Sequence, residues 1–236
     1  MRIQKLVKPI VLIGCVGVMA YALLNMNNKR EPLNYNEHLA DTAFKLDSEE
    51  VTFQDLAFYI LYEECKIEGQ AMIYNSDYPK DYWNMHTDDK FVQTEAKDAV
   101  LGMAVHDHLF YQMAKEEGMD TLTPEEEEML GYATTDFWED LLDIQYEKLP
   151  CNQETINQQI RIAAIAEKYQ NYLAEKDGPS VAAYNYDGYY YSQMLEEHDL
   201  KINKKLWNRF VMGDITLNHS KINYINGLTD EDKKKE

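Results

Sequence analysis

The spacing of apolar residues constrains this chain more than any other feature. Across four long segments, apolar side chains recur at intervals of three and four, which places them on one side of an α-helix. These segments run from about 52 to 74, 88 to 117, 123 to 148 and 152 to 177. The pattern predicts amphipathic helices that bury one face each against a shared core.

Capping residues set the expected ends of these helices. Thr52 with Asp55 three positions later predicts the first start, and Val51 is expected to pack on Leu56 as a hydrophobic staple. The clearest start is Thr123-Pro124-Glu125-Glu126, which has a capping hydroxyl, a proline in the first turn and a glutamate to answer the cap. Gly118 and the run Asp177-Gly178-Pro179 are typical of helix ends.

The third of these helices is expected to continue unbroken to Lys148. Its buried face is expected to consist of Met129, Ala133, Phe137, Leu141 and Ile144.

A fifth helix is expected from Ser180, with a helical turn at 203–210 that includes Trp207. Short strands are expected at 43–46, 200–202 and 214–217. The predicted fold class is therefore mainly α: a bundle of about five helices with a few short strands, preceded by an N-terminal signal peptide or transmembrane anchor.

Residues 1–30 have the composition of an export signal. A basic start precedes an apolar run from Pro9 to Leu24, and Lys29-Arg30 follow it. Three outcomes are open: an uncleaved membrane anchor, cleavage after Ala22, or lipidation of Cys15 in a sequence similar to a bacterial lipobox. In each case the rest of the chain is expected at the extracytoplasmic face of the cell membrane, or secreted if cleavage occurs.

Charge narrows the classes of partner. The first thirty residues hold five Lys or Arg and no acid, so the remaining 18 basic against 42 acidic residues give a net charge of −24. Phosphate backbones and anionic lipids would be repelled, which excludes nucleic acid and leaves the N-terminal segment as the membrane contact. This acidity suits a solvated surface or a groove for basic or unfolded chains. The sequence leaves the oligomeric state open.

The residues that could carry catalysis are few. In the pair His106 and His108, the side chains point to different sides of a helix, and His106 falls on an apolar stripe, which predicts a core histidine. Cys65 and Cys151 are expected to be buried, inert thiols, and whether they pair is open. No nucleophile, metal or phosphate-binding motif is present, so no catalytic residue and no cofactor is expected.

Tyrosines cluster in the segment YNYDGYYY. Tyrosine offers a large contact area at a small entropic cost, which suits binding surfaces, although helix packing explains such rings equally well. Five tyrosines within eight positions cannot all face one buried stripe, so some are expected to be partly exposed. They are Tyr184, Tyr186, Tyr189, Tyr190 and Tyr191.

The order of elements resembles a known family. The chain begins with an export signal and a short strand, followed by the helix start Val-Thr-Phe-Gln-Asp-Leu and a connection that contains Trp83. Next comes a long helix that ends in Leu-Phe-Tyr-Gln-Met-Ala-Lys-Glu-Glu-Gly-Met, and after it stands Leu-Thr-Pro-Glu-Glu. Together they resemble the N-terminal chaperone domain of the SurA and PrsA foldases, over roughly 43–176. The parvulin isomerase domain usual in those foldases has no counterpart here.

The resemblance implies an extracytoplasmic holdase without a recognisable isomerase site. It would divide the chain into a signal or anchor (1–30), a helical chaperone domain (31–228) and a charged tail (229–236). Extended segments of unfolded or nascent secreted polypeptides would bind in a cradle between helices and short strands, with Trp83 and the five tyrosines as candidate peptide-binding residues. Two alternatives remain: a diverged peptidyl-prolyl isomerase, and a dedicated structural subunit of a cell-envelope complex.

Overall fold

Helices dominate the computed structural model, which describes residues 31–87 and 90–219. The mainly α class is therefore confirmed. The expectations for residues 1–30, including Cys15, and for the tail 229–236 lie outside the described residues. The unit that begins at Pro32 contains the helices α2 (Ala57–Tyr74), α3 (Pro79–Trp83), α4 (Val92–Glu116), α5 (Pro124–Asp140), α6 (Asp143–Glu147), α7 (Gln153–Asp177), α8 (Tyr189–Leu195) and α9 (Lys204–Trp207).

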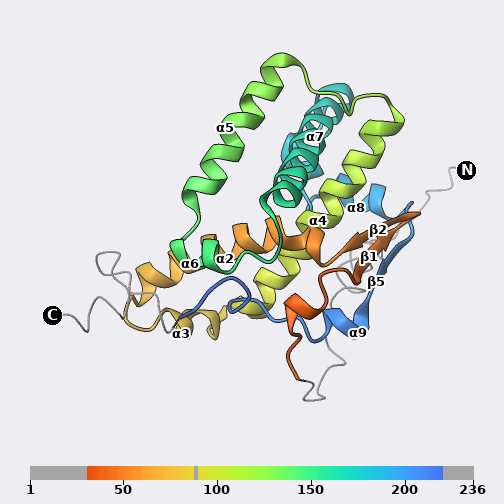
Figure 1. Ribbon diagram of the computed structural model, residues 1–236. Coiled ribbons are helices and arrows are strands. Elements are labelled where there is room, and N and C mark those ends of the chain that lie inside the picture. Colours follow the sequence, from red (N-terminus) through yellow and green to blue (C-terminus); the bar gives the residue numbers. More distant parts are fainter. Residues whose placement is uncertain (1–30, 88–89, 220–236) are drawn as a thin grey trace, which may run out of the picture. The chain divides into compact units, whose positions relative to one another are not determined.

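The centre of the core lies between α4 and α7. Both are 25 residues long and pack along each other, with α2 against them (Figure 1). Phe110 of α4 and Tyr169 of α7 meet edge to face, with ring centroids 5.9 Å apart. These helices have the apolar stripes that the spacing predicts. Helix α7 starts where expected, with the Asn152 side chain accepting from the Thr155 amide. Gly178 ends α7 with φ +83°, a conformation that favours glycine.

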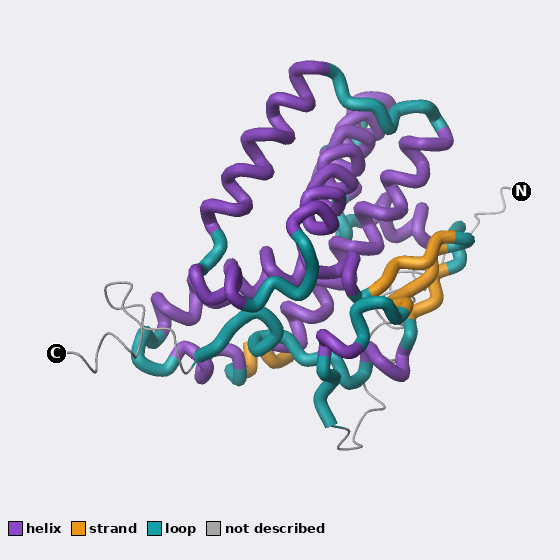
Figure 2. Tube along the Cα trace, viewed as in Figure 1, coloured by secondary structure: helices purple, strands orange, loops and turns teal. Residues whose placement is uncertain are grey.

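A small antiparallel sheet joins segments from both ends of the described chain. Its strands are β1 (Thr42–Leu46), β2 (Glu49–Thr52) and β5 (Leu200–Ile202), in the order β2-β1-β5, and a second pair is formed by β3 (His86–Thr87) and β4 (Lys90–Phe91) (Figure 2). Phe44 pairs with Ile202 across β1 and β5. The strands expected at 43–46 and 200–202 are confirmed, while β2 is additional.

The first long helix starts later than predicted. Thr52 ends β2, and its amide and hydroxyl both donate to the Asp55 carboxylate, at 2.8 and 2.7 Å. The chain then makes a 3₁₀ turn, Gln54–Leu56, before α2 begins. The pairing of Thr52 with Asp55 is therefore present, but the Thr52 hydroxyl donates instead of capping the helix, because strand pairing fixes the backbone at this point.

The helix predicted from 123 to 148 is two helices. Leu141 and Leu142 are extended, with ψ of 142° and 144°, and they separate α5 from α6. Gln145 fixes this break: its side-chain oxygen accepts from the Leu142 amide, and its Nε2 donates to the carbonyl of Leu61 and the hydroxyl of Thr216. Leu61 and Thr216 lie 84 and 71 residues away along the chain, so local spacing could not reveal the break.

The predicted fifth helix is also two elements, a 3₁₀ turn (Val181–Tyr184) and α8. Gly188 lies between them, where an added Cβ would stand 2.4 Å from the carbonyl oxygen of Ala183. The close approach of these two backbone segments therefore requires glycine.

The segment 214–217, expected to be a strand, instead wraps around a buried carboxylate of α2. Glu64 is fully buried and accepts hydrogen bonds from the amides of Gly213, Ile215 and Thr216, at 2.7, 3.1 and 2.7 Å, and from the Thr216 hydroxyl at 2.5 Å. Burial raises the pKa of Glu64, and these four donors oppose that shift. Backbone amides that would otherwise pair in a sheet are satisfied here by one side chain.

Lys97 of α4 holds the segment after α9. Its buried ammonium donates to the carbonyls of Trp207 and Phe210, at 2.5 and 2.9 Å, and lies 5.2 Å from the centroid of the Trp207 ring. Trp207 and Phe210 stack with centroids 4.7 Å apart. Burial lowers the pKa of Lys97 to about 8.

No helix within 31–87 and 90–219 combines the length and apolar character needed to cross a membrane.

We expect Lys97→Met to lower the free energy of unfolding by about 1–3 kcal/mol, because it removes a donor from buried carbonyls. Lys90→Met is the matched control: the exposed Lys90 pairs with Asp98 at 2.5 Å, and such surface pairs contribute at most about 1 kcal/mol. Urea unfolding of both variants measures the difference. Equal effects would show that the carbonyl contacts of Lys97 do not stabilise the fold.

A pH-dependent contact is expected at His219. Burial lowers its pKa, but hydrogen bonds and attraction from Glu68 and Asp214, each 3.2 Å away, outweigh burial and raise it above 6.5. The stability advantage of the wild type over His219→Gln should be largest below about pH 6.5 and should shrink as the pH rises through the higher folded pKa. Urea unfolding at several pH values tests this, and Glu68→Gln should reduce the same pH dependence.

Candidate functional site

Helix α5 is an arm that packs on the core only through half-buried side chains, among them Leu130, Phe137 and Trp138. It is 17 residues long and has no buried residue. Its start is as predicted, since the Thr123 hydroxyl accepts from the Glu126 amide and the Glu126 carboxylate accepts from the Thr123 amide. The predicted burial is wrong for Met129, which is 65% exposed, and for Ala133, which is also exposed.

Polar contacts join α5 to the antiparallel α7. Arg161 makes a bidentate pair with Glu127, at 2.8 and 2.5 Å, and Lys168 lies 2.8 Å from Glu126. Nearer the other end of α5, the indole of Trp138 donates to Asn157 at 2.8 Å. These long side chains hold α5 beside α7 without close packing of the two helices along their length, and Figure 1 shows α5 as an outlying helix.

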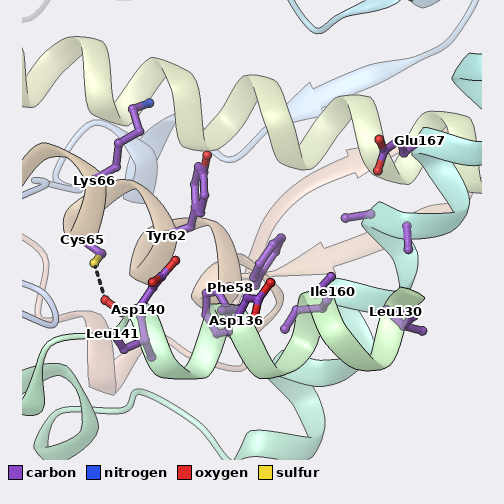
Figure 3. A pocket seen from close by; sticks show the side chains of 14 residues that line it. Phe58, Tyr62, Cys65, Lys66, Leu130, Asp136, Asp140, Leu141, Ile160 and Glu167 are labelled. Carbon is purple, nitrogen blue, oxygen red and sulfur yellow. Dashed lines mark hydrogen bonds between the residues drawn. The ribbon is translucent and has the colours of Figure 1, made fainter. Parts of the chain in front are cut away.

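A groove with a volume of about 610 Å³ lies between α5, α7 and α2. Its lining is mainly apolar (Figure 3) and comes from all three helices. The apolar residues are Phe58 and Tyr62 of α2, Leu130, Ala133 and Phe137 of α5, Leu141 after it, and Ile160, Ala163 and Ala164 of α7.

A second groove, of about 640 Å³, adjoins the first. The two share Leu130, Ala133, Ala164 and Glu167 in their linings, so together they follow α5 and α7. Met119, Leu122 and Met129 extend the apolar lining toward the start of α5.

Three aromatic rings contact one another in the lining of the first groove. Phe58 meets Phe137 with ring centroids 5.2 Å apart, and Tyr62 lies 6.4 Å from Phe58. Phe58 and Phe137 are half-buried and Tyr62 is 46% exposed, so the faces turned to the groove are accessible.

The groove carries negative charge that the described residues do not neutralise. Asp136, Asp140 and Glu167 line it and are exposed, and their carboxylates have no hydrogen bond or ion pair among residues 31–87 and 90–219. The lining cation, Lys66, is already paired with Glu63 at 2.7 Å.

The groove includes a thiol of low reactivity. Cys65 donates from its Sγ to the Asp140 carbonyl at 3.1 Å, and burial raises its pKa. Burial also raises the pKa of Cys151, to about 11. Both are free and half-buried, which is less burial than the sequence predicted, and the raised pKa values favour the thiol over the nucleophilic thiolate.

The tyrosine cluster divides between core and surface. Tyr186, Tyr189 and Tyr190 are 41%, 54% and 41% exposed, which confirms the expectation of partial exposure. Tyr184 and Tyr191 are each 3% exposed, so their placement in a peptide-binding surface is corrected. The Tyr191 ring packs on His106 and Phe110 of α4, with centroids 5.1 and 5.8 Å apart, and the Tyr184 carbonyl bonds to His106.

Tyr186 packs on α4 while remaining partly exposed. Its ring rests on Gly102 of α4, where an added Cβ would approach it to 2.7 Å. Burial raises its pKa.

Trp83 is a core residue, which corrects its assignment as peptide-binding. It is 3% exposed, and its indole donates to the buried Glu68 at 2.7 Å. Its ring also lies under Gly213, where an added Cβ would come within 2.8 Å. The contact with Gly213 therefore covers the Trp83 ring, which leaves little of it exposed to a ligand.

The histidines are satisfied core residues. His106 is 7% exposed and contacts Asp107 and the Tyr184 carbonyl, at 2.8 and 3.0 Å, as its apolar position predicts. His108 contacts Glu49 and Gln159. Within the described residues, no group of three or more His, Cys, Asp or Glu side chains is placed to hold a metal ion.

The groove could have been found from one signal in the sequence. Asp136 and Asp140 follow Ala133 by three and seven positions, which puts them on the same side of α5 as Ala133 and Phe137. Carboxylates within a stripe that was expected to be buried indicate that the stripe is exposed.

No protein-family model matches this chain, and neither a curated protein nor a solved structure matches it significantly.

We expect the amides of α5 to exchange with solvent at least about tenfold faster than those of α4 and α7, because its burial is so small. Hydrogen exchange followed by mass spectrometry measures this. Arg161→Ala should increase exchange in α5 further by removing the pair with Glu127. Protection of α5 equal to that of α7 would contradict a loosely held arm.

Proposed function

We propose that this protein is an extracytoplasmic chaperone-like holdase, which binds apolar segments of unfolded polypeptides in the groove between α2, α5 and α7. The observation that carries the proposal is the exposed apolar face of α5 opposite the apolar faces of α2 and α7. Exposed apolar surface with polar residues at its rim is a common mark of a binding site.

The size of the groove suits segments of polypeptide. Its volume lies in the range of pockets that enclose ligands of several hundred daltons, and the second groove adjoins it. Burying a large apolar side chain contributes about 1.5–3 kcal/mol. A few such side chains from a client would give reversible binding after the cost of ordering the segment, as a holdase requires.

Two sequence features support the same proposal. The basic, apolar segment 1–30 favours export, which would place the groove where secreted chains emerge. The order of elements resembles the SurA and PrsA chaperone domains, whose implied cradle lies between helices and short strands. The groove takes the place of the tyrosine cluster as the proposed binding surface. The isomerase and structural-subunit alternatives stay predictions.

We expect Ala133→Glu to weaken the suppression of aggregation about tenfold, because it places a carboxylate in the shared lining of both grooves. The assay is light scattering of a reduced, unfolding client at increasing ratios of the chain to client. Thr135→Glu is the matched control, since Thr135 is exposed on the same helix and lines neither groove.

Absence of suppression by the wild-type chain at stoichiometric ratio would sink the proposal. Equal loss in Ala133→Glu and Thr135→Glu would place client binding outside the groove. Circular dichroism of both variants checks that α5 keeps its helix.

A further inference from the structure

The walls of the groove are helices, and this limits the conformation of a bound segment. Apart from Leu141, the lining residues belong to α2, α5 and α7, whose interior backbone groups are paired within each helix, and none of them belongs to a strand. An extended guest pressed into the apolar lining would bury backbone groups without partners. A helical guest satisfies its own backbone and presents one apolar face.

Small residues at the contact allow a helix to approach closely. Ala133 of α5 and Ala163 and Ala164 of α7 line the groove beside the rings of Phe58 and Phe137. At 1.5 Å per residue, the 17 residues of α5 extend about 25 Å. The arm can therefore accompany a guest helix of four or five turns.

The negative charge of the groove favours basic residues beside the apolar face of a guest helix. Asp136, Asp140 and Glu167 lack partners among the described residues, and Lys66 is paired with Glu63. Lysine or arginine beside the apolar face of a guest would meet these three carboxylates, whereas glutamate would be repelled.

We infer that the groove binds its client as a cationic amphipathic helix, with the apolar face against Ala133, Ala164 and Phe137 and with Lys or Arg beside Asp136, Asp140 and Glu167. The inference rests on the proposed function and names the segment that the holdase takes. It replaces the extended segment implied by the family resemblance.

Three labelled peptides of about 18 residues test the inference against the full chain by fluorescence anisotropy. The first combines Leu and Ala on one helical face with Lys at its edges; the second has Glu in place of each Lys; the third is the first with two central prolines. The Lys peptide should bind at least tenfold more tightly than either of the others, because of charge and because proline breaks the helix. Its helicity by circular dichroism should rise on binding.

Two variants show where the Lys peptide binds. Ala133→Glu should weaken its binding about tenfold, although the added carboxylate would strengthen a merely nonspecific attraction to this acidic chain. The double variant Asp136→Asn, Asp140→Asn should lose most of the preference for the Lys peptide over the Glu peptide. Thr135→Glu is the control and should keep the wild-type affinity for the Lys peptide.

Other outcomes would overturn the inference in distinguishable ways. Equal affinity for the proline peptide shows an extended guest, and equal affinity for the Glu peptide shows that the carboxylates do not select; in both, the proposed holdase function stands. If no peptide binds but suppression of aggregation is still lost in Ala133→Glu, the groove takes a different kind of segment. If suppression is absent as well, the proposed function fails with the inference.

Discussion

The buried carboxylate of Glu64 organises the part of the structure on which α5 depends. It collects the amides of Gly213, Ile215 and Thr216 on one side of α2. Thr216 in turn accepts from Gln145, whose side chain also bonds the Leu61 carbonyl and fixes the start of α6. Because buried polar groups are costly when unpaired, removing one member would leave several others without partners.

This network gives the groove one rigid side and one loosely held side. α2 is locked to the segment around 213–216, and α7 is packed along α4 in the core. α5 ends at the two extended leucines before α6 and is joined to α7 by ion pairs and one indole hydrogen bond. Exposed pairs of this kind contribute little stability, which in the proposed function would let the arm adjust to guests of different size. A binding surface that accepts varied clients benefits from such adjustment.

Local signals predicted much of the helical structure but little of the site. The end of α2 at Tyr74, the caps at Thr123 and Asn152 and the stop at Gly178 follow from side chains close in sequence. The division of the third helix at Leu141 and the loop around Glu64 depend on partners more than seventy residues away along the chain. The composition of the tyrosine cluster suggested a binding surface, yet two of its rings are buried in the core.

The sequence by itself determined that the described chain is mainly helical, where most helices begin or end, and that the chain is strongly acidic, because spacing, capping and charge are properties of nearby residues. Tertiary structure decided which apolar stripes are buried. The stripes of α4 and α7 meet each other, while that of α5 stays open because the break at Leu141 and Leu142 and the polar contacts to α7 hold this helix away from the core. An amphipathic pattern states that a helix has an apolar face, but the rest of the fold determines whether that face meets the core or remains free for a ligand.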